Sequence, residues 1–447
     1  MQKKSIFWLT LILSVFLPLV AACGSNTPTG TTKPTSTISS GENLYVLDGY
    51  TPLGSQSTGQ HIVAFHPGSA NPTTLVTLPA GLTSLDHQRI YIATPQNGQT
   101  TISIYNTQTG TTTRSFVISG TYSTAGQDYA TSVISPDGRW LVLRQTEQTG
   151  DQTTIALIDT QAGKLARTIS LNGDFDLDAV SPDGGSLYLL ERLSDQSGHY
   201  YVRLYDVAES RLYENPIIDK TEINDPRMTG SALTRQMASD GTVAYTLYID
   251  TPHNVAFVHI LPMNGDGFPF ARCVDLPVGK SADLLRYYTL ALSSDGSILY
   301  AANGALGVVS AISLGNASAN DIWNDKIVAT GHFNPGGINL TSDDKTRMLY
   351  KGAALSPDQQ TLYFAGVDGI WAVKTADLRS GVTNLSNIDH YLTQQAFTGI
   401  GLSADGRTLY AVDPTKGITL LDAATGQPEQ VIQGPAHTPW GIAWITD

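Results

Sequence analysis

The segment Ser403-Ala404-Asp405-Gly406-Arg407-Thr408-Leu409-Tyr410-Ala411-Val412 decides the fold, because its pattern recurs along the chain. An apolar residue, Ser, any residue and Asp follow one another in a phrase that occurs seven times at intervals of 46 to 63 residues. One copy has Thr83 in place of the apolar residue, and only one copy has Ala in place of Ser. The turn residues are Asp86, Asp137, Asp183, Asp240, Asp295, Asp358 and Asp405. A period near 50 residues indicates an array of supersecondary units.

Each copy predicts a β-hairpin followed by two more strands. Asp can bond the backbone two residues on and Gly accepts a positive φ, so the phrase suits a tight turn. A run with a period of two, such as 408–412, follows the turn, and Tyr stands five residues after Asp in six of the seven copies. We interpret the repeated Asp as turn residues and the repeated Tyr as packing aromatics. Third and fourth strands, such as 418–421 and 164–169, complete one blade of a β-propeller.

The two ends of the chain predict how the ring closes. Residues 440–447 are similar to 398–405 and end at Asp447, which matches the turn Asp. If the count goes on from Asp447 to Gly41, Tyr45 is the fifth residue after this Asp, as in the other copies. We therefore predict that the last residues form the innermost strand of a blade whose other strands lie near 44–47, 62–65 and 74–78. The predicted all-β fold has eight four-stranded blades, or seven if 230–279 forms no blade of its own. Closure removes open sheet edges, and we expect a monomer.

The segments 403–412 and 418–426 resemble bacterial YVTN-type and WD40-like β-propeller repeats. The resemblance covers roughly residues 42–447 as one domain. The Trp-Asp dipeptide of true WD40 repeats is missing, which favours the YVTN-like side. The resemblance implies the fold but not one function, since such propellers include surface binding proteins, lactonases and periplasmic assembly factors.

The N-terminus predicts secretion and a lipid anchor. Lys3 and Lys4 precede an apolar run and the small-residue site Val20-Ala21-Ala22, as in a secretory signal peptide of residues 1–22. Cys23 follows at once, so this segment resembles a bacterial lipoprotein box in which Cys23 is lipidated. Residues 23–41 are then the lipidated Cys and a Thr/Ser/Pro-rich tether that reaches about 50–60 Å when extended. We expect the domain in the bacterial cell envelope, on the extracytoplasmic side of an inner or outer membrane.

Composition excludes some partners. The chain has 26 Lys and Arg against 39 Asp and Glu, a net charge of −13, and no basic cluster interleaved with aromatic residues. Such a balance repels phosphate backbones, so we expect no nucleic-acid partner. Only Cys23 and Cys273 are present, and lipidation of the first leaves Cys273 as a packed residue without a disulfide partner.

The resemblance places candidate ligand residues at one mouth of the central channel, where the innermost strands begin. Counting back seven residues from each turn Asp gives Pro79, Ala130, Asp176, Leu233, Tyr288, Lys351, Thr398 and Trp440. With their neighbours, the candidates for a polar pocket with an aromatic wall are His437, Trp440, Asp176, Asp178, Arg235, Tyr288 and Lys351. Alternatively, this mouth is a solvated channel without a ligand. The connections 219–230 and 333–348 are further candidate binding loops, or else tolerated insertions.

Two classes of function remain open at this point. The first is a non-enzymatic propeller that binds a protein, a glycan or a small molecule. The second is a lactonase-like hydrolase acting through His437, Asp176 and Arg235. No catalytic motif supports the second class, and Asp176 with Asp178, expected on one strand face, supplies too few oxygens for calcium. We expect no metal and no cofactor, and binding is favoured over catalysis.

Overall fold

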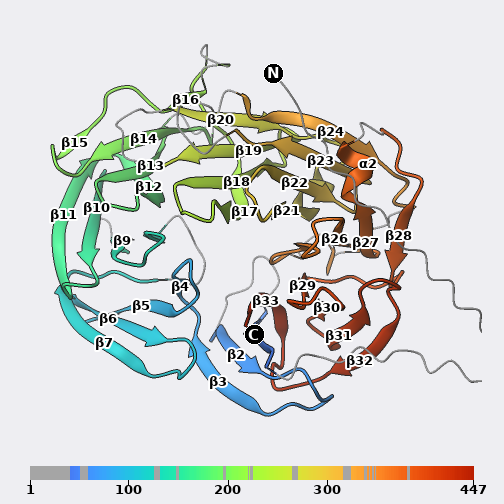
Figure 1. The fold of residues 1–447 in the computed structure, drawn as a ribbon. Coiled ribbons are helices and arrows are strands. Elements are labelled where there is room, and N and C mark those ends of the chain that lie inside the picture. The colour runs from blue at the N-terminus through green and yellow to red at the C-terminus, as the bar shows by residue number, and fades with distance from the viewer. Residues whose placement is uncertain are drawn as a thin grey trace, which may run out of the picture. The chain divides into compact units, whose positions relative to one another are not determined.

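A computed structural model gives the architecture (Figure 1). The described residues are 41–50, 59–124, 131–146, 151–194, 198–219, 221, 225–263, 270–315, 324–336, 340–341, 343–344, 347, 349–379 and 383–446. The predicted leader, Cys23 and the tether up to residue 40 lie outside this set. The 3-10 helix η1 (Ala282–Tyr287) and the helix α2 (Thr375–Arg379) are short. Within the described ranges, no helix has the length and apolar character needed to span a membrane.

The described strands form eight sheets, seven of four strands and one of five. Blade 1 contains β1 (Asn43–Asp48), β2 (His61–Phe65), β3 (Thr74–Pro79) and β33 (Pro439–Thr446). Blade 2 contains β4 (Leu82–Thr83), β5 (Arg89–Gln96), β6 (Gln99–Asn106) and β7 (Thr112–Ser119). Blade 3 contains β8 (Ser132–Ile134), β9 (Trp140–Arg144), β10 (Gln152–Asp159) and β11 (Lys164–Asn172). Blade 4 contains β12 (Asp174–Val180), β13 (Ser186–Arg192), β14 (Tyr200–Asp206) and β15 (Arg211–Leu212).

The remaining blades follow in chain order. Blade 5 contains β17 (Ser231–Met237), β18 (Val243–Asp250), β19 (Val255–Pro262) and β20 (Phe270–Asp275), with β16 (Ile218–Asp219) added parallel to β20. Blade 6 contains β21 (Tyr288–Leu292), β22 (Ile298–Asn303), β23 (Val308–Ser313) and β24 (Lys326–His332). Blade 7 contains β25 (Ala353–Leu355), β26 (Thr361–Gly366), β27 (Gly369–Lys374) and β28 (Ile388–Tyr391). Blade 8 contains β29 (Gly399–Leu402), β30 (Thr408–Asp413), β31 (Gly417–Asp422) and β32 (Pro428–Ile432).

The blades form a closed ring, which confirms the predicted eight-bladed β-propeller, including a separate blade for 230–279. Successive innermost strands contact each other, as β25 does with β29 and β29 with β33, whereas the fourth strands lie on the rim (Figure 1). We call the end where the innermost strands begin the loop mouth, and the end with the Ser-x-Asp turns the turn face. The innermost strand of blade 2 starts only at Leu82, so Pro79 ends the outer strand β3 instead of lining the mouth.

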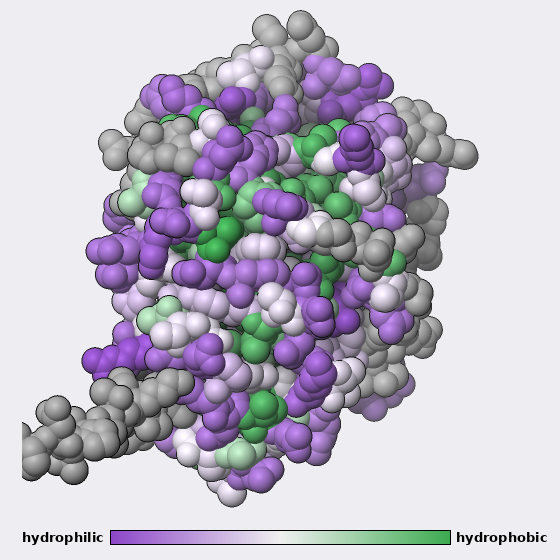
Figure 2. Space-filling model, turned by 90° about the vertical axis from the view of Figure 1, so that its right-hand side faces the viewer, coloured by the Kyte–Doolittle hydropathy of each residue, from purple (hydrophilic) through white to green (hydrophobic). Residues whose placement is uncertain are grey.

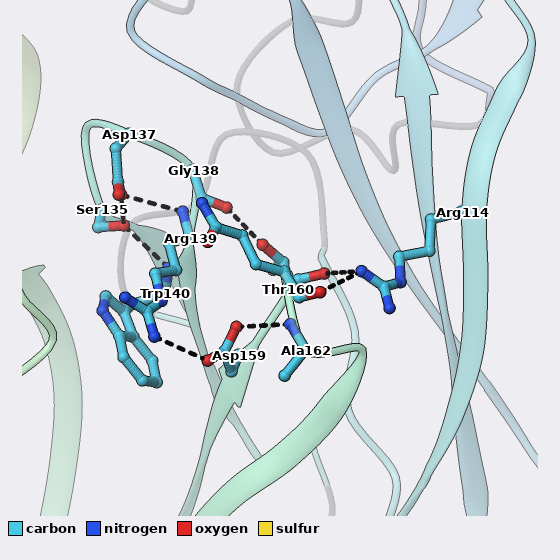
Figure 3. Close-up of polar contacts among 10 residues, drawn as sticks. Arg114, Ser135, Asp137, Gly138, Arg139, Trp140, Asp159, Thr160 and Ala162 are labelled. Atoms are coloured by element: carbon cyan, nitrogen blue, oxygen red, sulfur yellow. Dashed lines mark hydrogen bonds and ion pairs between the residues drawn. The ribbon is translucent and has the colours of Figure 1, made fainter.

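The turn phrase forms the predicted hairpin, as Figure 3 shows for blade 3. The Ser135 hydroxyl donates to Asp137 Oδ1 at 2.6 Å and accepts from the Trp140 amide at 2.9 Å. Asp137 Oδ1 also accepts the Arg139 amide at 3.0 Å. In the copy with Ala238, the Thr242 hydroxyl instead donates to Asp240 at 2.7 Å. The repeated carboxylates are therefore occupied by their own turns, as expected of turn residues.

The repeated Tyr residues belong to the core, as predicted. Every one is at most 5 % exposed: Tyr45, Tyr91, Tyr188, Tyr245, Tyr300, Tyr363 and Tyr410. They lie where one blade packs on the next. A Cβ on Gly138 of blade 3 would lie 2.1 Å from the Tyr91 hydroxyl of blade 2, and the Tyr363 hydroxyl of blade 7 donates to the Ala423 carbonyl of blade 8 at 3.0 Å. Burial of these rings therefore stabilises contacts between blades as well as within them.

The ring closes within blade 1, as predicted. Strand β1 pairs with β2 on one side and with β33 on the other, so both ends of the domain share one sheet. The buried Glu42 adds a contact with blade 8, because its carboxylate accepts the Tyr410 hydroxyl and the Ala404 amide. Pairing with β33 thus removes the free edge that β1 would otherwise present.

Polar contacts also link the rim strands of neighbouring blades. Arg114 on β7 donates to the Thr160 and Gln161 carbonyls of blade 3 (Figure 3). Arg167 on β11 donates to the Val207 carbonyl of blade 4. The outer surface is mostly hydrophilic, with apolar residues in small separate patches, on the side that Figure 2 shows.

Candidate functional site

Asp176 on β12 is held by arginines of its own and the preceding blade. Arg192 Nη2 lies 2.8 Å from Asp176 Oδ2, and Arg144 Nη1 lies 3.0 Å from Asp176 Oδ1. The Asp176 side chain is only 10 % exposed. Both carboxylate oxygens therefore have cationic partners within the protein.

Asp178 and Arg235 form a buried ion pair between blades 4 and 5. Asp178 occupies a break in the β12–β13 register, and such a bulge re-aims a side chain. Arg235 on β17 donates to the Asp178 carboxylate and, at 2.7 Å, to its carbonyl. The side chains are 8 % and 2 % exposed. The expectation that Asp176 and Asp178 share a strand face is therefore wrong, because they contact arginines of opposite neighbouring blades.

The residues around Asp178 belong to the hydrophobic core and do not line a cleft. Tyr248 and His259, on β18 and β19, are each 1 % exposed. Burial lowers the pKa of His259 to about 4 and raises the pKa of Tyr248 well above its usual value. Both groups are thus uncharged at neutral pH. Asp178 Oδ2 has no hydrogen-bond partner within the described ranges, a cost of burial that the Arg235 contact offsets.

His437 lies across the ring from Arg235. It precedes β33 of blade 1, whereas Arg235 belongs to blade 5, and Figure 1 places β33 and β17 on opposite sides of the channel. The buried Asp48 accepts the backbone amides of His437 and Thr438 at 3.0 and 2.6 Å, which fixes this loop while the His437 residue stays exposed. The fold therefore does not bring together the three residues of the hydrolase hypothesis.

Tyr288 belongs to the core and not to the channel wall. It is 1 % exposed, and its hydroxyl donates to the Pro277 carbonyl at 2.5 Å. Burial raises the pKa of this phenol. The other sequence candidates, Trp440 and Lys351, lie near each other between blades 7, 8 and 1.

Lys351 lies where the chain enters blade 7. The preceding residue, Tyr350, pairs with blade 8, since its amide donates to the Thr398 carbonyl at 2.6 Å. Lys351 itself has a φ of +48°, a left-handed conformation that is uncommon for a residue with a Cβ. Its ammonium donates to the Ala443 carbonyl of β33 in blade 1, although the residue keeps exposed surface. The Lys351 side chain thus reaches from blade 7 past blade 8 to blade 1.

Two glycines on the innermost strands make this crossing possible. A Cβ on Gly399 of β29 would lie 2.5 Å from the Tyr350 carbonyl oxygen, and one on Gly441 of β33 would lie 2.5 Å from Tyr350 Cδ1. Both distances are far below van der Waals contact. Glycine at these positions lets Tyr350 approach the innermost strands of two neighbouring blades this closely.

Three half-buried aromatic rings follow one another beside Lys351. Its Nζ lies 5.9 Å from the Tyr350 ring centroid, Tyr350 lies 5.7 Å from Trp440, and Trp440 lies 5.9 Å from Tyr50. All three aromatic residues keep some exposed surface. We call Tyr50, Trp440, Tyr350 and Lys351 the mouth cluster. Counting along the repeat identifies Trp440 and Lys351, but it misses Tyr50 and Tyr350, which have no fixed place in the repeat.

A second stack lies towards the turn face. Trp444 stacks on Tyr45 at 4.5 Å and on His87 at 5.2 Å. Burial, followed by the charge of Lys351, lowers the pKa of His87 to about 4. His87 is therefore uncharged at neutral pH, and Lys351 is the cation of this region. Burial in turn lowers the pKa of Lys351 to about 8.

Other features of the described chain do not form a reaction centre. Grooves of about 310 and 430 Å³ lie between blades 7 and 8 and between blades 2 and 3, away from the mouth cluster. No group of three or more His, Cys, Asp or Glu among the described residues is arranged to hold a metal ion. Cys273 is half-buried and packs against the core between blades 4 and 5. The candidate loops 219–230 and 333–348 are described only in part.

No protein-family model and no curated protein matches the chain. Solved structures resemble it at low identity. The periplasmic gluconolactonase of Pseudomonas aeruginosa is 16 % identical with a TM-score of 0.41, over 89 % of this chain and 97 % of that one. Dihydro-heme d1 dehydrogenase NirN is 13 % identical with a TM-score of 0.46, over 90 % and 74 % of the chains. TolB from Acinetobacter baumannii is 17 % identical with a TM-score of 0.34, over 61 % of each. These likenesses concern the fold alone.

Proposed function

We propose that this chain is a lipid-anchored, extracytoplasmic binding protein that holds a ligand at the loop mouth, between blades 7, 8 and 1. The observation that carries the proposal is the mouth cluster, an aromatic row beside the Lys351 ammonium. Ligand sites combine apolar walls with a few placed polar groups. A glycan or small molecule suits a cluster of this size.

Binding accounts for this geometry better than hydrolysis does. Asp176 and Arg235 are engaged in separate ion pairs, and His437 stands across the ring from Arg235. General acid–base catalysis needs such groups within hydrogen-bond reach of one substrate. The mouth cluster needs no such convergence, because stacking and one charge suffice for binding.

The location in the proposal rests on the N-terminal sequence. Replacing Cys23 by Ser in the full chain should move the protein from the membrane fraction to the soluble extracytoplasmic fraction, because a single lipidated Cys is the only attachment proposed. Retention of the Cys23→Ser variant in membranes would contradict the lipid anchor.

Ligand binding is tested with the full chain purified in detergent. The melting temperature is measured against series of sugars, lactones and cell-wall fragments, since a ligand of the native state raises it once its concentration passes Kd. Trp440→Ala should abolish the shift, and Tyr213→Ala, a half-buried ring at the rim of blade 4, should leave it intact. A shift that survives Trp440→Ala would place the site elsewhere. Lactone hydrolysis that His437→Ala abolishes would support the hydrolase instead.

A further inference from the structure

The partners of Lys351 set it apart from the other charged candidates of the loop mouth. Asp176 and Asp178 each have an arginine partner. In contrast, Lys351 donates to a backbone carbonyl, and no carboxylate of the described chain pairs with it. An ammonium has three donor hydrogens, so the Ala443 carbonyl leaves two of them for other acceptors.

Backbone strain and loss of hydration accompany the position of this ammonium. The left-handed backbone of Lys351 is strained, and its position inside the ring removes part of its hydration, which lowers its pKa to about 8. Strain and desolvation of one residue together are typical of a functional position. A bound anion would restore the lost electrostatic stabilisation of the ammonium.

The neighbouring groups suit an anion that carries a ring. His87 is uncharged at neutral pH, so its ring does not compete with the Lys351 ammonium for a bound anion. Tyr350 and Trp440 supply half-buried aromatic rings, with the Lys351 ammonium 5.9 Å from the Tyr350 ring and the two rings 5.7 Å apart. Aromatic side chains bind the apolar faces of flat rings, while the adjacent charge selects their substituents.

We propose that the mouth cluster is selective for carboxylated ring ligands, whose carboxylate pairs with Lys351 and whose ring lies on Trp440 and Tyr350. This inference rests on the proposed function and adds the chemical class of the ligand. Acidic saccharides and aromatic acids share this chemistry. Both bring a carboxylate to a position where a cation has no acidic partner.

The test compares acids with neutral analogues of the same ring, using the full chain in detergent. Glucuronate is titrated against glucose, and benzoate against benzyl alcohol, by calorimetry. At least one acid should bind on the order of tenfold more tightly than its neutral analogue, as expected for a partly desolvated charge pair. The acid that binds identifies the source of the carboxylate.

Variants of Lys351 isolate the charge from the fold. Lys351→Asn removes the ammonium and tolerates the left-handed backbone, so this variant should fold and lose the preference for the acid. Lys351→Arg should keep the preference. Binding of the acid to the wild-type chain should be full between about pH 5, above which the carboxylate is ionised, and about pH 8. It should weaken as the pH rises through about 8, where the ammonium loses its proton. Lys351→Asn should remove that pH dependence.

The outcomes separate the two proposals. Acid and neutral ligands that bind equally would overturn the inference about charge and leave the binding function in place. Failure of all four ligands, together with no shift from any compound of the broader series, would overturn both. An acid preference that survives in Lys351→Asn would also overturn the inference, since the charge must then come from another residue.

Discussion

The contribution of a buried side chain to the stability of this propeller depends on its hydrogen-bond partners as well as on its position in the repeat. Tyr91 and Tyr363 occupy the same repeat position, yet the Tyr91 hydroxyl is buried without a partner in the described chain and the Tyr363 hydroxyl donates to the Ala423 carbonyl. An unpaired buried hydroxyl costs free energy, whereas a paired one contributes about 1 kcal/mol. The sequence predicts the burial of both rings but not this difference, which depends on contacts with the next blade.

Tyr363→Phe should therefore lower the free energy of unfolding by about 1 kcal/mol, and Tyr91→Phe should leave it unchanged or raise it. Each variant keeps the ring and its packing, so the pair is its own control. Denaturant unfolding curves measure both values. Equal losses in the two variants would mean that the Tyr91 hydroxyl has a partner in solution.

The turn carboxylates should make the fold sensitive to acid. Hydrogen bonds from Ser293 and Ser297 lower the pKa of Asp295 from 3.8 to about 2. A folded pKa below the unfolded one means that the stability from this group is complete above about pH 3.8 and is lost as the pH falls through about 2. Ser293→Ala should reduce the drop in melting temperature between pH 4 and pH 2. Ser239→Ala, at the variable position between Ala238 and Asp240 of the turn in blade 5, is the control and should retain the full drop.

Among the elements, strands could be predicted well and departures from regular strands could not. The period of two placed β1, β2, β3 and β33 correctly, including their shared sheet. Counting along the repeat did not predict the bulge at Asp178 or the two-residue length of β4, because neither feature has a local signal in the sequence. The crossing of Tyr350 depends on Gly399 and Gly441, 49 and 91 residues further along. Tyr50 and Tyr350, half of the mouth cluster, could therefore not be predicted from the sequence pattern.

Arginines on the rim strands should stabilise contacts between blades. Arg114 donates to two carbonyls of blade 3, and hydrogen bonds from a charged donor contribute about 1.5–3 kcal/mol each at most. Because Arg114 is exposed, we expect Arg114→Met to lower the free energy of unfolding by about 1–2 kcal/mol. Arg211→Met is the control, since Arg211 and its partner Glu209 are 55 % and 59 % exposed, and it should cost less than Arg114→Met. Chemical denaturation measures both.

At the scale of the whole molecule, the ring depends on its closure. The Glu42 carboxylate joins blade 1 to blade 8 through Tyr410 and Ala404. Glu42→Ala would leave the buried Tyr410 hydroxyl without this acceptor and should cost about 1–3 kcal/mol. Glu42→Gln keeps an oxygen for one donor and should cost less. If Glu42→Ala unfolds like the wild-type chain, closure rests on β33 alone.

The placement of β1 has a mechanical consequence. Its first residue follows the proposed tether directly, and it lies between two partner strands instead of at a sheet edge. Tension on a tethered protein, from shear at a cell surface or from a partner pulling on its ligand, would act on this strand first. Because two hydrogen-bonded ladders hold β1, neither neighbour can peel away alone to release it. The ring would bear load at the point where the tether joins it.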